Sequence, residues 1–199
     1  MYRFYKSYKG VLSTRFLCEA FWYRKGNKMD NLVIRKVKVE DLRDVAEIVV
    51  NGWQTAYKGI VEDDYLENLS IDEKYQKMLK NYKENGFIVA EQNNKIVGFC
   101  KYCEVNKYIK EYPEVDCELC ALYVKTEEKR KGIGSKLVKY VMNEFKNKNL
   151  KKMIIWCFKD NYKARNFYEK MDGSYCGESS CVRGNKEYKK VGYVYNLQK

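Results

Sequence analysis

The segment from Asp116 to Lys146 constrains the possible fold of this 199-residue chain more than any other. It begins with an apolar run of strand length, passes through a basic turn that contains two glycines, and ends in an amphipathic helix. The N–H groups of a helix's first turn and the positive end of its dipole face the turn that precedes it. The segment therefore predicts a strand, turn and helix that together bind an anion.

The turn itself reads Lys129-Arg130-Lys131-Gly132-Ile133-Gly134-Ser135. Three cations beside two glycines suit a pyrophosphate, because glycine lets the backbone come close to the ligand. The dinucleotide pattern needs a third glycine where this chain has Leu137, and the P-loop pattern is absent. Taken alone, the turn could equally be an ordinary glycine-containing helix start.

The rest of the chain predicts a single α/β domain. Strands are expected at 32–37, 87–91, 95–102, 116–124, 152–158 and 188–197, with one more near 175–181. Helices are expected at 42–53, 71–83, 136–146 and 161–171. We place the domain at 29–199, after a basic, aromatic N-terminal extension at 1–28 whose role the sequence does not indicate.

Charge and composition limit the class of function. The net charge is +12, and residues 1–28 carry half of it, with seven Lys or Arg residues and one acidic residue. The body is therefore mildly basic, which favours an anionic ligand without requiring nucleic acid. No run approaches the ~20 apolar residues of a membrane span, so we expect a protein without membrane contact.

Eight cysteines and no histidine narrow the chemistry. Without histidine there is no Ser-His-Asp or Cys-His nucleophile and no His-ligated metal. The irregular cysteine spacing, with no secretory signal, predicts reduced thiols in the cytoplasm. Cys100, Cys103, Cys117 and Cys120 are spaced like a zinc ribbon, but residues three apart on a strand point to opposite faces, so we expect no metal.

Three motifs occur in a characteristic order: Glu118-Leu-Cys-Ala-Leu-Tyr-Val124, then the glycine turn, then Asn161-x-x-Ala164-x-x-Phe167-Tyr168. Together they resemble the GNAT superfamily of acetyl-CoA-dependent N-acetyltransferases, from about Leu32 to the C-terminus. The segment from Trp53 to Val61 is similar to a bacterial branch of it. The resemblance implies one domain with a mixed, mostly antiparallel sheet, helices on both faces, and fourth and fifth strands that splay apart.

The resemblance also implies how acetyl-CoA binds as co-substrate. The pantetheine arm would enter between the splayed strands and pair with Leu122, Tyr123 and Val124. The turn would hold the pyrophosphate, although Lys129 stands where the family has Arg or Gln and so lacks their planar fork. Asn161 matches the asparagine that contacts the cofactor arm, and Ala164 and Phe167 belong to the same motif.

Two residues match catalytic positions of the family. Tyr168 matches a tyrosine that protonates the leaving thiolate, although its place on the apolar stripe of a helix also suits packing. Glu118 resembles an acidic residue that acts as a base in some relatives, and a salt-bridging or orienting role stays open. Trp53, Tyr57 and Tyr65 fall where relatives shape the acceptor pocket, or they belong to the core.

The resemblance thus implies direct acetyl transfer from acetyl-CoA to a primary amine of a small molecule or peptide. Two alternatives stay open: an inactive acyl-CoA-binding module, and a zinc-ribbon nucleic-acid binder. A homodimer is compatible with the family. The acceptor cannot be read from the sequence, because one fold serves many acceptors.

Overall fold

The computed structural model describes residues 31–83, 86–104 and 112–198. The predicted extension at 1–28 lies outside the described residues. The elements follow the order β1 (Leu32–Lys36), η1 (Val39–Asp41), α2 (Leu42–Ala56), α3 (Asp63–Glu67), α4 (Ile71–Asn81), β2 (Gly86–Gln92), β3 (Lys95–Glu104), β4 (Cys117–Val124), η2 (Thr126–Glu128), α5 (Ile133–Asn147), β5 (Lys152–Phe158), α6 (Tyr162–Lys170), β6 (Ser174–Arg183) and β7 (Lys186–Asn196).

The seven strands form one sheet in the order β1-β2-β3-β4-β5-β7-β6. All neighbours are antiparallel except β4 and β5, which are parallel. A parallel pair needs a crossover, and α5 supplies it between these two strands. The mixed, mostly antiparallel sheet expected from the sequence is therefore confirmed.

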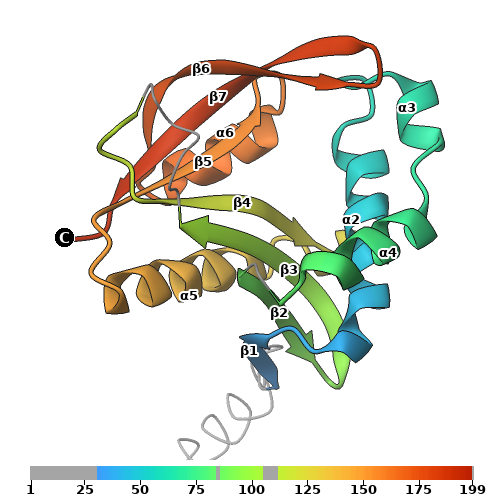
Figure 1. Cartoon of the computed structure of the whole chain (residues 1–199), viewed down its shortest axis with the longest axis horizontal. Helices are drawn as coiled ribbons and strands as arrows, with labels where there is room; N and C mark the ends of the chain where they lie inside the picture. Colours follow the sequence, from blue (N-terminus) through green and yellow to red (C-terminus); the bar gives the residue numbers. More distant parts are fainter. Residues whose placement is uncertain (1–30, 84–85, 105–111, 199) are drawn as a thin grey trace, which may run out of the picture. The chain divides into compact units, whose positions relative to one another are not determined.

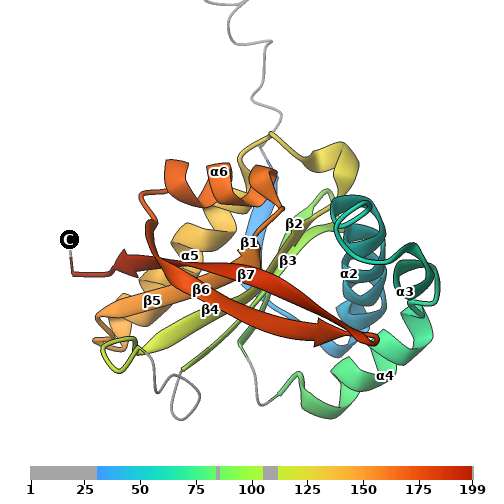
Figure 2. The same ribbon diagram turned by 90° about the horizontal axis from the view of Figure 1, so that it is seen from above.

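Helices cover both faces of the sheet, as Figures 1 and 2 show. On one face, α2 and α4 enclose a core with β2 and β3 that includes Leu42, Val45, Val89 and Phe99. On the other face, α5 packs Ile133 and Leu137 so closely on β3 that a Cβ at Gly98 would lie 3.1–3.2 Å from them. The apolar stripes predicted for these helices face the sheet, which fixes the position of the turn before α5.

Some boundaries differ from the sequence prediction for local reasons. The helix α3 was not predicted, because five residues are too few to show a helical period. The helix expected at 71–83 ends at Asn81, and the one whose predicted faces begin at Lys136 already starts at Ile133. The strand near 175–181 exists as β6. No helix within the described ranges is long and apolar enough to cross a membrane.

A network around Arg35 joins β1 to the start of α2. Its guanidinium donates two hydrogen bonds to Asp41, at 2.6 and 2.9 Å, and a third to Glu91, at 2.6 Å. The Lys38 N–H also donates to Asp41, at 2.7 Å. Burial opposes ionisation of Asp41, but the bonds from Arg35 and Lys38 outweigh it and lower the pKa of this carboxyl. The network anchors the edge strand on which α2 depends.

Asp41→Asn should lower the free energy of unfolding at pH 7 by about 2 kcal/mol, because charge-assisted hydrogen bonds to a mostly buried carboxylate are lost. A carboxyl with a lowered folded pKa stabilises above its unfolded pKa of ~3.9, and this stability is lost as the pH falls through the folded value. The variant should therefore lose less stability than the parent in acid. Urea titrations at pH 7 and pH 3 measure both effects.

Asp72→Asn is the matched control, since Asp72 is paired with Arg43 on the surface, where the two side chains are 74% and 59% exposed. It should change stability by less than about 0.5 kcal/mol. Equal effects of the two substitutions would contradict the role given to the Arg35 network.

Candidate active site

The central feature of the site is a parting of two neighbouring strands. β4 and β5 pair only at Cys117 with Met153 and at Glu118 with Ile154. Beyond Glu118, β4 pairs with β3 alone, and β5 stays paired with β7. The strands thus separate toward Val124, and the backbone of β4 that would face β5 is left unpaired by that strand, as the family resemblance predicted (Figure 1).

A bulge lies next to the point where the strands part. The register between β3 and β4 shifts at Lys101 and Tyr102, whose partners are Ala121 and Leu119, so Cys120 is the extra residue. A bulge bends its strand and increases the local twist. The bulge therefore turns the second half of β4 away from the line of β5.

The basic turn has the backbone of an anion-binding loop. Arg130 and Gly132 have φ values of 64° and 81°, both in the left-handed region, and α5 begins directly afterwards at Ile133. Backbones that pass through such left-handed residues turn successive N–H groups into one concavity, which favours anions. Lys129 and Arg130 are exposed, whereas Lys131 is paired with Glu128 at 2.7 Å.

The glycine turn lies against the helix that carries the third motif. A Cβ at Gly134 would lie 3.5 Å from the ring of Phe167 and 3.9 Å from Val124. The predicted cofactor residues of β4, the turn and α6 are therefore neighbours. Asn161 caps α6: its Oδ1 accepts from the Ala164 N–H at 3.1 Å. This role was not predicted, and it leaves the amide nitrogen as the donor that Asn161 could offer a cofactor.

An aromatic cluster links the expected acceptor residues to β4. Trp53 and Tyr57 meet edge to face at 4.8 Å, and Tyr57 meets Phe158 at the same distance. Burial raises the pKa of the Tyr123 hydroxyl, and the neighbouring Tyr57 and Trp53 modify this shift. A Cβ at Gly52 would lie 2.7 Å from the Tyr123 ring, so α2 approaches β4 closely because residue 52 is glycine.

Tyr168 belongs to the same group of phenols. It is buried, and burial raises the pKa of its hydroxyl well above the usual value, with smaller effects from Cys157 and Tyr57. Burial likewise raises the pKa of Tyr123, and Tyr168 adds to this effect. Tyr168 therefore keeps its proton at neutral pH, as a proton donor must. Its ring also packs on Tyr193, at 6.0 Å between centroids, so it contributes to the core as well.

Glu118 is the last residue of β4 that still pairs with β5. Burial raises the pKa of its carboxyl, and Lys190 and Lys101 partly oppose this effect. A carboxylate with a raised pKa accepts protons more readily at neutral pH, which suits a base.

Several residues of this region were not found from the sequence. Phe158 ends β5 and completes the aromatic cluster, and Arg183 on β6 lies over the Trp53 ring at 5.6 Å. The side chain of Tyr123 was not predicted to bridge to α2, since only its backbone was considered. These contacts depend on register and helix approach, and no local pattern reveals them.

The sequence of the chain is similar to those of known proteins. The profile of the Acetyltransferase (GNAT) family matches residues 52–173. A protein of Archaeoglobus fulgidus described as an uncharacterized N-acetyltransferase is 33% identical over 141 residues, which cover 70% of this chain and 90% of the relative. The spermidine N(1)-acetyltransferase of Thermoplasma acidophilum is 28% identical over 149 residues, covering 70% and 86%.

A solved structure has the same fold. The PaiA N-acetyltransferase of Thermoplasma acidophilum, in complex with coenzyme A, superposes with a TM-score of 0.63 at 24% identity, over 82% of this chain and 99% of the other. Fold and site together define a class of proteins in which two central strands of the sheet separate next to the basic N-terminus of a helix. The chain belongs to the GNAT family and is an acetyl-CoA-dependent N-acetyltransferase.

Gly132→Ala should weaken coenzyme A binding severalfold and lower the free energy of unfolding by about 1 kcal/mol, because a Cβ is disfavoured at a positive φ. Calorimetric titration with coenzyme A and urea unfolding measure the two effects. Gly59→Ala is the matched control, since Gly59 has a φ of 77° and a Cβ added there would have nothing within 4 Å. It should lose similar stability but bind coenzyme A like the parent. Equal affinities of the two variants would contradict an anion site at the turn.

Proposed function

We propose that this enzyme transfers the acetyl group of acetyl-CoA directly to a primary amine, without an acyl-enzyme intermediate and without a metal. The observation that carries the proposal is the parting of β4 and β5 beyond Glu118, next to a basic helix start. An open strand edge offers N–H and C=O groups to an extended ligand, and the first turn of α5 offers N–H groups to phosphates.

In the proposed complex the cofactor runs from α5 into the parted strands. The pyrophosphate would be held by the backbone of Gly132, Ile133, Gly134 and Ser135, with Lys129, Arg130 and Lys131 supplying charge. The pantetheine arm would pair with Leu122 to Val124 and pass Asn161, Ala164 and Phe167. The neighbouring positions of Gly134, Phe167 and Val124 support one continuous binding path.

Proton transfers complete the proposed reaction. The amine nitrogen attacks the thioester carbonyl carbon, and Glu118 accepts the proton that the amine loses. The carbon–sulfur bond then breaks, and the Tyr168 hydroxyl gives its proton to the leaving thiolate. The raised pKa values of Glu118 and Tyr168 support these roles, because the carboxylate is a stronger base and the phenol stays protonated.

For the acceptor we propose a small-molecule or peptide amine that contacts Trp53 and Tyr57. Spermidine is the first compound to test, because the Thermoplasma relative is named for it. We place the protein in the cytoplasm, without nucleic-acid or membrane partners, and a homodimer is part of the proposal. The proposed transfer to an amine is tested by measuring the release of free thiol from acetyl-CoA across a panel of polyamines, amino acids, aminoglycosides and peptides. If no amine in a broad panel releases thiol, while acetyl-CoA binds, the chain is a binding module instead.

Tyr168→Phe should lower kcat by about 100-fold or more, because the leaving thiolate loses its proton donor, while coenzyme A affinity stays within about twofold. Thiol release and calorimetry give the two values. Tyr162→Phe, on the same helix but 64% exposed, is the matched control and should retain full activity. A Tyr168→Phe enzyme as fast as the parent would show that another group is the acid.

Glu118→Gln should lower kcat/KM by about 100-fold at neutral pH. In the parent, kcat/KM should rise with pH through a pKa above the ~4.3 of an ordinary glutamate, since the base must be ionised. In the Glu118→Gln variant, kcat/KM should lack the rise assigned to Glu118 and should keep only the rise caused by deprotonation of the amine substrate. Rate profiles between pH 5 and pH 10 measure the difference.

A measurement of stability distinguishes the loss of the catalytic base in Glu118→Gln from partial unfolding of the variant. A carboxyl with a raised folded pKa is most favourable when protonated, so its contribution is lost as the pH rises through the folded value. Glu118→Gln should therefore be at least as stable as the parent at pH 7. Glu104→Gln, on the neighbouring strand and exposed, should leave the pH profile unchanged. An unaltered profile in Glu118→Gln would contradict the assigned base.

A further inference from the structure

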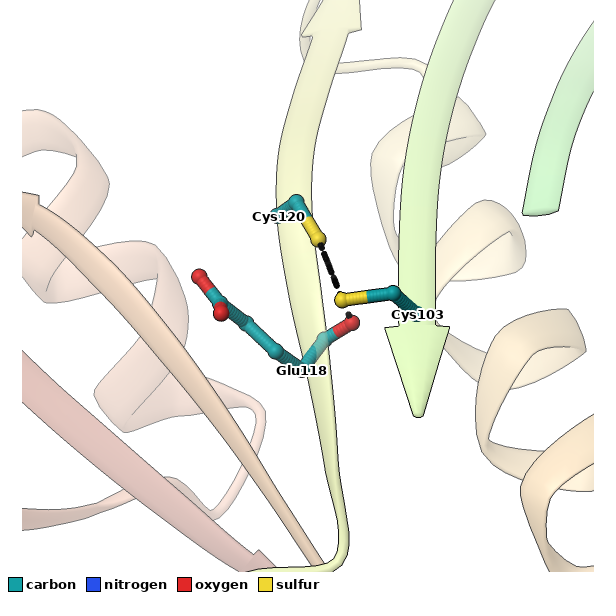
Figure 3. Close-up of side chains that lie close together, drawn as sticks. All are labelled: Cys103, Glu118 and Cys120. Carbon is teal, nitrogen blue, oxygen red and sulfur yellow. Dashed lines mark hydrogen bonds between the residues drawn. The ribbon is translucent and has the colours of Figure 1, made fainter. Parts of the chain in front are cut away.

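Two cysteines from different C-x2-C pairs meet across β3 and β4. The Cys103 and Cys120 sulfurs are 3.2 Å apart, and both side chains are half-buried. Glu118 is the β4 residue directly opposite Cys103, so it lies on the same face of the sheet. The two sulfurs and a Glu118 carboxylate oxygen all lie within 4.8 Å of one another, and Figure 3 shows the sulfurs side by side with the carboxylate extending away from them.

The alternation of side chains along β3 and β4 brings this group together. Residues three apart on a strand point to opposite faces, so neither C-x2-C pair chelates an ion by itself. Cys100 and Cys117 are indeed fully buried, whereas Cys103 and Cys120 are not. Cys120 is two residues from Glu118 on β4, and Glu118 is paired with Cys103, so all three side chains lie on one face of the sheet. One cysteine of each pair therefore contributes to a shared cluster that neither pair forms alone.

The donor set matches a soft divalent cation. Zinc binds thiolate sulfur at ~2.3 Å and carboxylate oxygen at ~2.0–2.2 Å, so two sulfurs in a tetrahedral site lie ~3.8 Å apart. The thiols would need to separate by about half an ångström, and the Glu118 carboxylate would need to turn toward them. Two thiolates and a carboxylate would leave the zinc complex with one excess negative charge. Lys101 and Lys190, which already act on Glu118, are placed to offset it.

We propose that Cys103, Cys120 and Glu118 form a zinc-binding site at the closed end of the parted strands, and that zinc bound there inhibits acetyl transfer. On binding, each thiol releases its proton to water and its sulfur donates a lone pair to the ion. Three protein ligands leave a fourth position for water. The inhibition rests on the proposed function, because a Glu118 carboxylate bound to zinc cannot accept the proton of the amine. The binding itself does not depend on that function.

Competition between the protein and a chromophoric zinc chelator tests the site, with the full chain reduced by a phosphine and with no acetyl-CoA or amine present. The parent should bind one zinc per chain. Cys103→Ser and Cys120→Ser should each weaken binding by at least about tenfold, and Glu118→Gln by about tenfold. Cys176→Ser, a half-buried cysteine on β6, should bind like the parent. Cadmium should produce a thiolate charge-transfer absorption in the parent that both cysteine variants lack.

Activity provides the second readout. Zinc should slow thiol release by the parent, a chelator should restore it, and Cys120→Ser should resist inhibition. If reduced protein binds no zinc, or if the cysteine variants bind it as well as the parent, there is no site here. A pair that binds no zinc but readily forms a Cys103–Cys120 disulfide under a peroxide would also overturn the proposal. Zinc that binds at these cysteines without slowing the reaction would overturn the inhibitory role.

Discussion

The site depends on the short parallel contact between β4 and β5. Two paired positions hold the halves of the sheet together, and beyond Glu118 the strands separate. Neither strand is left without support, because β4 keeps its antiparallel partner β3 and β5 keeps β7. The sheet can therefore carry an open edge in its centre, where an exposed edge strand would otherwise risk pairing with another chain. A ligand that pairs with that edge completes the sheet.

The packing on both sides of the sheet keeps the gap in place. On one side α2 comes so close to β4 that a Cβ at Gly52 would lie 2.7 Å from the Tyr123 ring. On the other side the first turn of α5 touches Phe167 of α6 through Gly134. The proposed acceptor side and the proposed cofactor side are thus joined through β4. A change in the position of β4 would disturb both sides, and at Gly52 only a glycine leaves room for the Tyr123 ring.

The fold could be predicted well from the sequence because its signals are local. The apolar stripes of α2 and α5 and the strand at 152–158 all follow from short-range patterns of apolar residues. The order of the three motifs supplied the topology and the splayed strands, through family resemblance. The bulge at Cys120 could not be predicted, since its signal is a register between two strands rather than a pattern in either. The Cys103–Cys120 contact and the bridging role of Tyr123 were missed for the same reason.

The most direct test is a crystal structure of the chain with coenzyme A. We expect the pyrophosphate on the backbone N–H groups of residues 132–135, and the pantetheine between β4 and β5 with hydrogen bonds to the backbone of residues 122–124. A pantetheine bound elsewhere, with β4 and β5 paired along their full length, would contradict the assigned site.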